Sequence, residues 1–314
     1  MRAIAVKSFK ATHEMIDVPE PKPNDDEVLV RFSAAGINPF DWKIGDGMLD
    51  GQVGHTFPLI LGLDGAGTVE AVGSKTKRFK VGDAVFGQFW QLPLGRGTYA
   101  QLCAVTEDAP IAKKPERLSM ADAAALPTAG MAALDLLEKS GLKTGDVVLI
   151  VGATGGVGQF LTQLASQRGL KVVATGTPKD VAMLKGLGAS TVVDFTAGSL
   201  TSQVRDLFPK GIEGVLDLVS NPAGFADVTK LVHANGVALT SNFVADEKAL
   251  ASAGLRGGNF VVGANAAVLE GLGAVAAAGT LKITIENRVT FDQAIAAVAA
   301  SRTGQARGKT VIMI

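Results

Sequence analysis

The sequence predicts an α/β protein: a doubly wound parallel sheet preceded by a separate β-rich region. The first observation is an apolar run, 147–151, that leads directly into a glycine-rich turn, 152–158. The second is that strand-like and helix-like segments alternate after Asp146, whereas the first hundred residues are typical of short strands joined by turns. Because such alternation is typical of parallel sheets covered by helices on both faces, the two textures predict two different domains.

The β-rich region is predicted from short apolar or alternating segments. Glu27 to Phe32 alternates with period two, as a half-buried strand does, and follows a connector with prolines at 19, 21 and 23. We expect strands at 1–9, 27–32, 67–72, 84–87 and 99–105. An alanine-rich helix should follow Ser119 as its N-cap, with a second helix over 130–140.

The parallel sheet is predicted to contain six strands, with a helix over 157–168 after the first. Their ranges are 147–151, 172–175, 191–193, 214–219, 236–241 and 260–263. The tail from about Ala266 has no place in this sheet. It should contain a helix, a strand at 281–285, a helix at 291–301 and a last strand at 310–314, and we expect it to pack with the N-terminal region. The expected domains are therefore 1–122 with 266–314, and 123–265.

Composition excludes several classes of function. The 314 residues fit two domains, and Lys+Arg and Asp+Glu each number 30, so no global basic field favours nucleic acid or an anionic membrane. Cys103 is the single cysteine, which excludes an intramolecular disulfide and a thiolate zinc cluster. No basic stretch followed by an apolar one opens the sequence, and no uninterrupted apolar run reaches ~18 residues. We expect a cytoplasmic protein whose partner is a small molecule, not nucleic acid or a membrane.

The turn at 152–158 indicates a dinucleotide site. Glycines allow a sharp turn and close approach of a ligand, and the next helix presents free N–H groups to a pyrophosphate. The spacing is not a clean G-x-G-x-x-G, because Ala153 and Thr154 stand where the middle glycine would be. In an NAD site an acid follows ~20 residues later. Here Thr175-Gly176-Thr177-Pro178-Lys179 carries none before Asp180, so we expect NADPH as the cofactor.

These stretches resemble the medium-chain dehydrogenase/reductase superfamily, and within it the zinc-independent branch of quinone oxidoreductases and alkenal/one oxidoreductases. The matching segments run in family order over nearly the whole chain. They are 36–43 (Gly-Ile-Asn-Pro-Phe-Asp-Trp-Lys), 57–67 (Phe-Pro-Leu-Ile-Leu-Gly-Leu-Asp-Gly-Ala-Gly), 81–85, 152–158, 187–189 and 306–309. The resemblance implies a GroES-like catalytic domain, a Rossmann domain, a cleft between them and hydride transfer from NADPH.

The resemblance also implies a set of site residues. Asn38, Phe40 and Asp41 stand at the catalytic position of the family. The implied cofactor contacts are Lys43, Thr128, Thr154, Gly155, Gly156, Val157, Thr175, Gly176, Thr177, Lys179, Val219, Ser220, Ser241, Asn242, Phe243, Gly263, Ala264, Asn265 and Lys309. Thr128 is included because Ala132 stands where the family has a threonine near the nicotinamide. Asn38 could equally be a turn former, Asp41 a helix cap and Lys43 a surface lysine.

Zinc ligands are missing from the positions where zinc-dependent relatives carry them. Asn38 stands in place of a cysteine, and Leu63 stands in place of the histidine of a Gly-His-Glu motif. Catalytic zinc needs three protein ligands, and His13, His55 and His233 do not fall at ligand spacing. We therefore expect no metal, which moves the expected substrates from simple alcohols to conjugated acceptors.

The most specific function that follows is an NADPH-dependent reductase of quinones or α,β-unsaturated carbonyls. A conjugated acceptor spreads the negative charge that follows hydride transfer, so the protein need only align the reactants and supply a donor. The bulky segment 86–94 either shapes an apolar acceptor pocket or belongs to the core, and Tyr99 is expected to be structural. Two alternatives remain, a zinc-free ketone or aldehyde reductase and a non-catalytic NADPH-binding protein. We expect a homodimer, with strand 260–263 as a candidate edge.

Overall fold

The computed structural model describes all 314 residues, which form two compact units. Unit 1 comprises Met1–Met131 and Ala264–Ile314, and unit 2 comprises Ala132–Gly263. Unit 2 therefore begins nine residues after the expected start at 123 and ends two residues before the expected end at 265. No helix is both long enough and apolar enough to cross a membrane.

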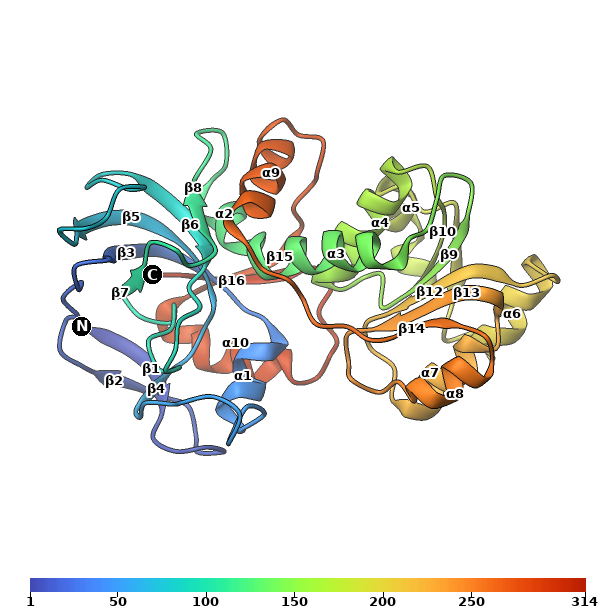
Figure 1. Cartoon of the computed structure of the whole chain (residues 1–314), viewed down its shortest axis with the longest axis horizontal. Helices are drawn as coiled ribbons and strands as arrows, with labels where there is room; N and C mark the ends of the chain where they lie inside the picture. The colour runs from blue at the N-terminus through green and yellow to red at the C-terminus, as the bar shows by residue number, and fades with distance from the viewer. The chain divides into compact units, whose positions relative to one another are not determined.

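Unit 2 contains a six-stranded sheet with the order β11-β10-β9-β12-β13-β14, in which every pair is parallel. Helices cover both faces, with α4 and α5 on one side and α7 and α8 on the other (Figure 1). The elements are β9 (Val147–Val151), α4 (Gly156–Gln167), β10 (Lys171–Gly176), η1 (Pro178–Asp180), α5 (Val181–Gly186), β11 (Thr191–Asp194), α6 (Leu200–Leu207), β12 (Ile212–Asp217), α7 (Pro222–Thr229), β13 (Val232–Thr240), α8 (Glu247–Ser252) and β14 (Arg256–Asn259). The doubly wound parallel sheet expected from the sequence is confirmed.

One expected strand of this sheet was placed wrongly. The sixth strand is Arg256–Asn259, not 260–263. Its two central residues are glycines, and a Cβ on Gly257 would lie 2.0 Å from the carbonyl oxygen of Ala238. The close approach of the two backbones therefore requires glycine, which removes the apolar side chains that make a strand visible in a sequence.

Unit 1 contains a three-stranded sheet, β2-β1-β4, and a larger sheet with the order β15-β16-β3-β5-β6-β8, in which β7 also pairs with β3. The elements are β1 (Arg2–Val6), β2 (Glu14–Asp17), β3 (Glu27–Gly36), α1 (Pro39–Gly45), β4 (Leu59–Ile60), β5 (Asp64–Val72), β6 (Ala84–Gln88), β7 (Leu102–Thr106), β8 (Ile111–Lys113), α2 (Met120–Ala125), α9 (Ala266–Ala277), β15 (Ile285–Thr290), η2 (Phe291–Gln293), α10 (Ala294–Ser301) and β16 (Lys309–Met313). The helix α3 (Pro127–Ser140) starts in unit 1 and ends in unit 2.

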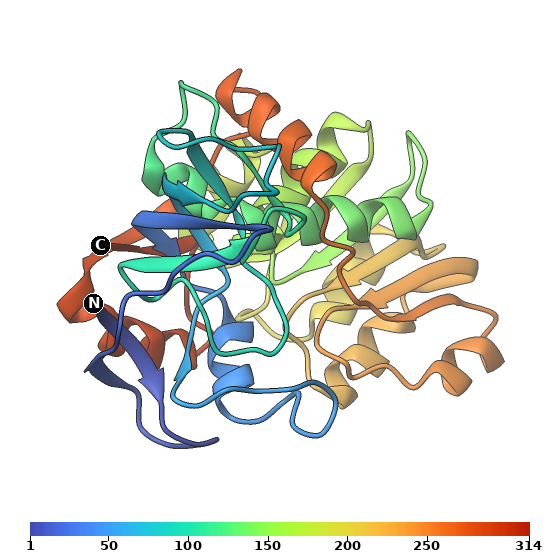
Figure 2. The same cartoon turned by 60° about the vertical axis from the view of Figure 1, so that its left-hand side comes forward.

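The C-terminal tail returns to the N-terminal strands, as expected from the sequence. β16 pairs antiparallel with β3, with Ile312 opposite Ala35, and pairs parallel with β15 on its other side. The red C-terminal elements therefore lie beside the blue N-terminal ones in both views (Figure 2). The strand expected at 281–285 is wrong, because β15 begins only at Ile285.

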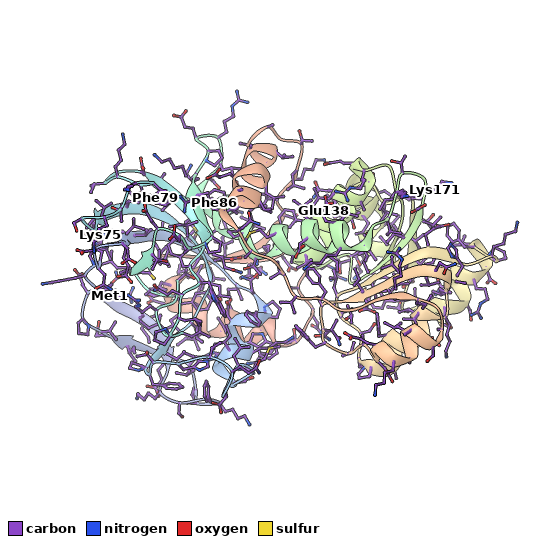
Figure 3. All side chains as sticks on the ribbon, viewed as in Figure 1. Met1, Lys75, Phe79, Phe86, Glu138 and Lys171 are labelled. Carbon is purple, nitrogen blue, oxygen red and sulfur yellow. The ribbon has the colours of Figure 1, made fainter.

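Each unit has its own apolar core. Phe79 and Phe86 are buried in unit 1, while the side chain of Lys75 lies outside (Figure 3). In unit 2, Glu138 and Lys171 are exposed, whereas four successive residues of β9 are buried, as a central parallel strand requires.

Candidate functional site

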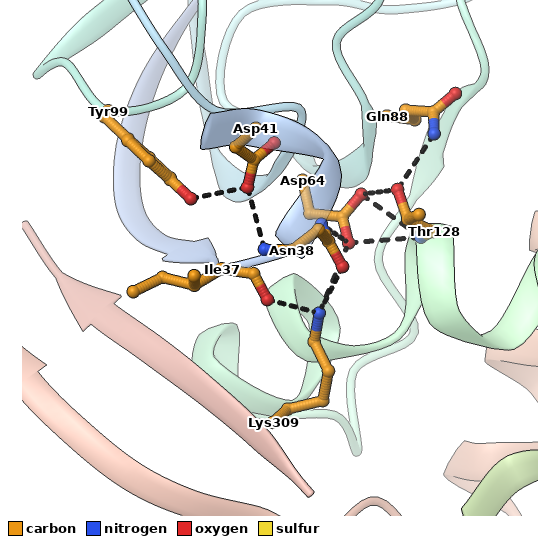
Figure 4. Close-up of polar contacts among 8 residues, drawn as sticks. All are labelled: Ile37, Asn38, Asp41, Asp64, Gln88, Tyr99, Thr128 and Lys309. Carbon is orange, nitrogen blue, oxygen red and sulfur yellow. Dashed lines mark hydrogen bonds and ion pairs between the residues drawn. The ribbon is translucent and has the colours of Figure 1, made fainter. Parts of the chain in front are cut away.

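A buried cluster of polar groups lies in unit 1, where the ends of several elements meet (Figure 4). Residues 37–41, at the start of α1, supply three members, and the starts of β5, α3 and β16 supply one each. The last two come from the end of β6 and from the segment before β7. The members are Ile37, Asn38, Asp41, Asp64, Gln88, Tyr99, Thr128 and Lys309. Apart from Thr128, each is buried.

Asn38 stands at the centre of this cluster. It is the N-cap of α1 in extended backbone, and only 4% of it is exposed. Its Oδ1 accepts a hydrogen bond from the ammonium of Lys309 at 2.5 Å, and its Nδ2 donates to Asp64 Oδ2 at 2.9 Å. Both ends of the carboxamide are therefore bonded within the protein.

Asp64 connects Asn38 with Thr128. The carboxylate is fully buried and accepts from the backbone N–H of Thr128 at 3.1 Å and from its hydroxyl at 2.6 Å. The Thr128 oxygen in turn accepts from Gln88 Nε2 at 2.8 Å. Lys309 Nζ lies 4.0 Å from Asp64 Oδ2 and completes an ion pair. Asp64 and Gln88 were not among the expected site residues, although Asp64 belongs to the segment 57–67 that carries the resemblance.

Asp41 forms the second half of the cluster. Its Oδ2 accepts from the backbone N–H of Asn38 at 2.7 Å and from the hydroxyl of Tyr99 at 2.5 Å. The first bond closes the start of α1, which favours the alternative role of Asp41 as a helix cap over the catalytic role implied by the resemblance. Tyr99 is completely buried, which confirms its expected structural role.

A small cavity of about 20 Å³ adjoins Asp41. Asp41 and Gln91 both line it, and Asp41 Oδ1 and Gln91 Oε1 are buried acceptors without a hydrogen-bond partner. A cavity of ~10–15 Å³ with two or more polar partners is sufficient for one water molecule. The cavity therefore fits a water that bridges the two oxygens.

Burial dominates the electrostatics of the cluster. It raises the pKa of Asp41 to about 7, although the hydrogen bonds from Tyr99 and Asn38 oppose the rise. Burial also raises the pKa of Asp64 and lowers the pKa of Lys309, and each of these two groups opposes the shift of the other. With Asp41 protonated, one carboxylate and one ammonium remain, so the buried charges balance.

The expected aromatic and lysine residues near α1 are only partly buried. The ring of Phe40 stacks on that of Trp90 with centroids 6.3 Å apart, whereas Phe86 and Phe89 belong to the core. Lys43 Nζ lies 5.7 Å from the centre of the Trp42 ring. The segment 86–94 thus contains core residues, the half-buried Trp90, and Leu92 and Pro93, which are exposed.

In unit 2 the glycine turn has the geometry of a ligand cradle. Gly155 is the N-cap of α4, and the first turn of this twelve-residue helix carries no acid. A Cβ on Gly158 would lie 2.2 Å from the carbonyl oxygen of Gly152, so no other residue fits at this close packing of turn and helix. The expected residues Thr154, Gly155, Gly156 and Val157 all lie in this turn, half-buried.

At the tip of β10 the hydroxyl groups of the threonines are bonded within the protein. The hydroxyl of Thr175 is buried and accepts from the backbone N–H of Gly152 at 3.0 Å. The hydroxyl and backbone N–H of Thr177 both donate to Asp180 Oδ2, at 2.7 and 2.8 Å. Asp180 is turned inward and only 4% exposed, whereas Lys179 is exposed.

The strand ends of unit 2 bring the other expected residues together. Asp217, which the sequence did not single out, is fully buried, and its Oδ1 accepts from the backbone N–H groups of Val219 and Ser220 at 2.9 and 2.8 Å. Asn242 Nδ2 donates to the carbonyl oxygen of Ser220 at 3.1 Å, so the loops after β12 and β13 are joined. The sequence did carry a signal for Asp217, because it is an acidic residue at the end of a mostly apolar strand.

The remaining expected positions lie nearby in sequence or at a unit boundary. Phe243 is half exposed and has a positive φ of 58°, and Ser241 follows β13 directly. Gly263 donates its N–H to Asp135 Oδ2 at 2.7 Å in unit 2. Ala264 and Asn265 belong to unit 1, where the Asn265 side chain caps α9 by accepting from Val268 N–H at 2.8 Å.

Two family models match this chain, the alcohol dehydrogenase GroES-like domain over residues 24–116 and the zinc-binding dehydrogenase over residues 187–312. The 2-methylene-furan-3-one reductase of Solanum lycopersicum is 34% identical over 94% of this chain and 74% of its own length. The chloroplastic NADPH-dependent alkenal/one oxidoreductase of Arabidopsis thaliana is 32% identical over 95% of this chain and 74% of its own.

Solved structures give the same assignment. The quinone oxidoreductase from Coxiella burnetii has a TM-score of 0.89 and 29% identity, with 100% of this chain and 99% of that one covered. The GroES-like and Rossmann parts expected from the sequence are thereby confirmed. The chain belongs to the medium-chain dehydrogenase/reductase superfamily, in the branch of the quinone and alkenal/one oxidoreductases, and is an oxidoreductase of a nicotinamide-dependent family.

Proposed function

We propose that this enzyme reduces quinones or α,β-unsaturated carbonyl compounds with NADPH and without zinc. The observation that carries the proposal is in the polar cluster, where the carboxamide of Asn38, bonded to the ammonium of Lys309, takes the place of the cysteine ligand of a zinc-dependent dehydrogenase. The names of the tomato and Arabidopsis relatives support the substrate class.

The residues of the cluster do not fit a zinc ion. Leu63 is 5% exposed and packs in the apolar core, and its side chain has no donor atom. The side-chain oxygen of Asn38 is already bonded to the ammonium of Lys309, which would repel a cation. No group of three or more His, Cys, Asp or Glu side chains converges anywhere in the structure. This chain therefore departs from the description of the family model that matches residues 187–312.

The residues of unit 2 do fit a dinucleotide. The N–H groups at the start of α4 and the close turn at Gly158 would hold the pyrophosphate. The exposed ammonium of Lys179 and the inward position of Asp180 favour a 2′-phosphate, since an exposed carboxylate at this tip would repel it. We assign Thr177 to the phosphate through its position only, because its hydroxyl proton is donated to Asp180.

The bound cofactor would supply the hydride, and the acceptor's conjugated oxygen would take up the negative charge. Asn38 Nδ2 carries two N–H groups, of which Asp64 takes one, and we assign the other to that oxygen. The stacked rings of Phe40 and Trp90 offer a flat apolar surface for a planar acceptor. These two contacts would orient the acceptor and stabilise its oxygen without a metal ion as Lewis acid.

The test is NADPH consumption with three acceptors: 9,10-phenanthrenequinone, an alkenal and a simple ketone. We expect oxidation with the quinone or the alkenal and a much slower rate with the ketone, unchanged after dialysis against a zinc chelator. Rapid turnover of the ketone would favour a carbonyl reductase. Tight NADPH binding without oxidation by any acceptor would contradict both enzymatic functions.

The cytoplasmic location, the homodimer and the small-molecule partner stay predictions. Because β14 is the edge of its sheet, Arg256–Asn259 takes the place of 260–263 as the edge available for pairing across a dimer.

A further inference from the structure

We infer that Lys309 is a positioning residue, whose ammonium fixes the carboxamide of Asn38 and, through Asp64, the hydroxyl of Thr128. This inference deepens the proposed function and rests on it, because Asn38 is assigned there to the acceptor, while Thr128 is a cofactor contact that the family resemblance implies. It replaces the direct cofactor contact that the sequence suggested for Lys309.

The first step is the direction of the lysine. Lys309 is the first residue of β16 and is 5% exposed. Its Nζ donates to the carbonyl oxygen of Ile37 at 2.8 Å and to Asn38 Oδ1, and it faces Asp64 Oδ2 at 4.0 Å. All three named acceptors belong to the protein, and an ammonium has three N–H groups to donate. The lysine head is therefore committed inward (Figure 4).

The second step is what this commitment does to Asn38. A carboxamide is nearly symmetric in shape, so its neighbours decide which end is oxygen and which is nitrogen. An ammonium accepts no hydrogen bond and a carboxylate donates none, so Lys309 must face Oδ1 and Asp64 must face Nδ2. The N–H groups of Asn38 consequently point to the carboxylate side of the cluster. Without the ammonium, only Asp64 would fix the orientation of the Asn38 carboxamide.

The third step leads to Thr128. Asp64 accepts both the N–H and the hydroxyl of Thr128, so the hydroxyl hydrogen is directed at the carboxylate. This direction requires an ionised Asp64, which burial disfavours and Lys309 supports. Gln88 then donates to the remaining side of the Thr128 oxygen. One ammonium thus determines the hydrogen-bond direction at two assigned site residues.

The charged groups that face Lys309 are Asp64 and Asp41, from β5 and α1. Lys309 also lowers the pKa of Asp41, in opposition to the rise caused by burial. Removal of the ammonium should therefore raise the pKa of Asp41 further. The pKa of Asp41 therefore reports on the Lys309 ammonium independently of catalysis.

The experiment compares Lys309→Met with Lys171→Met, which removes an exposed lysine at the first position of another strand, β10. We expect Lys309→Met to lower kcat by roughly tenfold to a hundredfold, as misplacement of reacting groups does. KM for NADPH should rise by a smaller factor than kcat falls, because Lys309 itself makes no contact with the cofactor and only the direction of the Thr128 hydroxyl is disturbed. Lys171→Met should leave both unchanged. A large rise in KM for NADPH with kcat preserved would show direct cofactor contact and overturn the inference.

The double variant Lys309→Met/Asp64→Asn covers the case in which the single variant fails to fold, because it leaves no unpaired buried charge. If it folds and binds NADPH but its kcat stays low, positioning is supported; if it has full activity, the inference is overturned.

A further readout separates this inference from the proposed function. Should the wild-type enzyme reduce none of the acceptors, NMR of Asn38 and Asp41 still tests the positioning. In Lys309→Met the side-chain N–H groups of Asn38 should exchange with solvent at least about tenfold faster, as expected when a hydrogen-bonded unit opens more readily. The titration midpoint of the Asp41 carboxyl carbon should rise. Unchanged exchange together with an unchanged midpoint would overturn the inference whatever the enzyme's activity.

Discussion

Asp41 and Tyr99 form a buried acid–phenol pair in which only one partner can hold a charge near neutral pH. Burial raises the pKa of Asp41 to about 7, and burial together with the neighbouring carboxyl group raises the pKa of Tyr99 well above its usual range. A buried acid with an orphaned oxygen is costly when ionised, so the protonated form suits this position best. The stability of the start of α1 should therefore depend on the pH of the solution, through the protonation of Asp41.

We predict that Asp41→Asn makes stability less dependent on pH. A folded pKa of about 7, against about 3.9 when unfolded, means that the folded chain binds the extra proton between these pH values. The stabilisation from Asp41 is thus present in full below the unfolded pKa and is lost as the pH rises through about 7. The unfolding free energy of the wild type, minus that of Asp41→Asn, should be larger at pH 5 than at pH 8.

Urea unfolding at the two pH values measures this difference, with Asp246→Asn as a control because Asp246 caps α8 at the surface. Equal differences at both pH values for Asp41→Asn would contradict the assignment.

At this scale the sequence identified some members of the cluster and could not show how they meet. The motif around Asn38 and Asp41 was visible because capping and strand ends are local patterns. The bonds of Asn38 to Asp64 and to Lys309 span 26 and 271 residues. No local pattern encodes such contacts, so Asp64 was missed as a site residue, and Lys309 was placed with the cofactor although its ammonium faces inward.

At the scale of elements, the close packing of β9, its turn and α4 determines where the helix N-terminus points. The turn has a positive φ of 86° at Gly152, and α4 leaves so close to it that Gly158 almost touches the turn's backbone. This arrangement combines a backbone requirement with a packing requirement, which is why two glycines recur six residues apart.

We predict that Gly158→Ala lowers the free energy of unfolding by about 1–3 kcal/mol, the usual cost of overpacking. The added Cβ would lie 2.2 Å from the Gly152 oxygen, so α4 must move and its N–H groups must shift. NADPH binding, measured by titration calorimetry, should weaken as well. Gly186→Ala in α5 is the matched control, because its Cβ meets no atom within 4 Å. That change should raise stability by about 0.5–1 kcal/mol and leave the affinity unchanged; weaker binding in both variants would refute the role of the turn.

Elements were predictable wherever the apolar pattern alone decides them. β9 was expected at 147–151 and occupies Val147–Val151, because a strand buried on both faces must be apolar throughout. β14 and β15 were misplaced because both are mostly exposed and are held by backbone pairing to a neighbour. Their side chains carry little signal, and the apolar residues next to them in sequence drew the prediction away.

For the whole molecule, NADPH binding should appear as a gain in stability by mass action. A ligand present at 100 times its Kd adds about 2.7 kcal/mol to the free energy of unfolding. We predict that NADPH raises the melting temperature more than NADH at equal concentration, because we propose that Lys179 pairs with the 2′-phosphate. Lys179→Asp should remove this difference. Lys210→Asp is the control and should preserve the difference, since this variant makes the same charge change at an exposed residue in the loop after α6. A stronger effect of NADH in the wild type would refute the assignment of Lys179.

The position of β16 within its sheet has a consequence for how the protein is made. β16 lies between β15 and β3, so a strand near the C-terminal end of the sequence joins one from the first forty residues. Unit 2 can fold while the ribosome is still translating, but Ala34–Gly36 at the end of β3 must wait for their β16 partners until residues 309–313 emerge. Lys309 arrives with that strand. A nascent chain could thus have a folded unit 2 that binds the cofactor while the polar cluster of unit 1 is still incomplete. We expect such a chain to be inactive until β16 is in place.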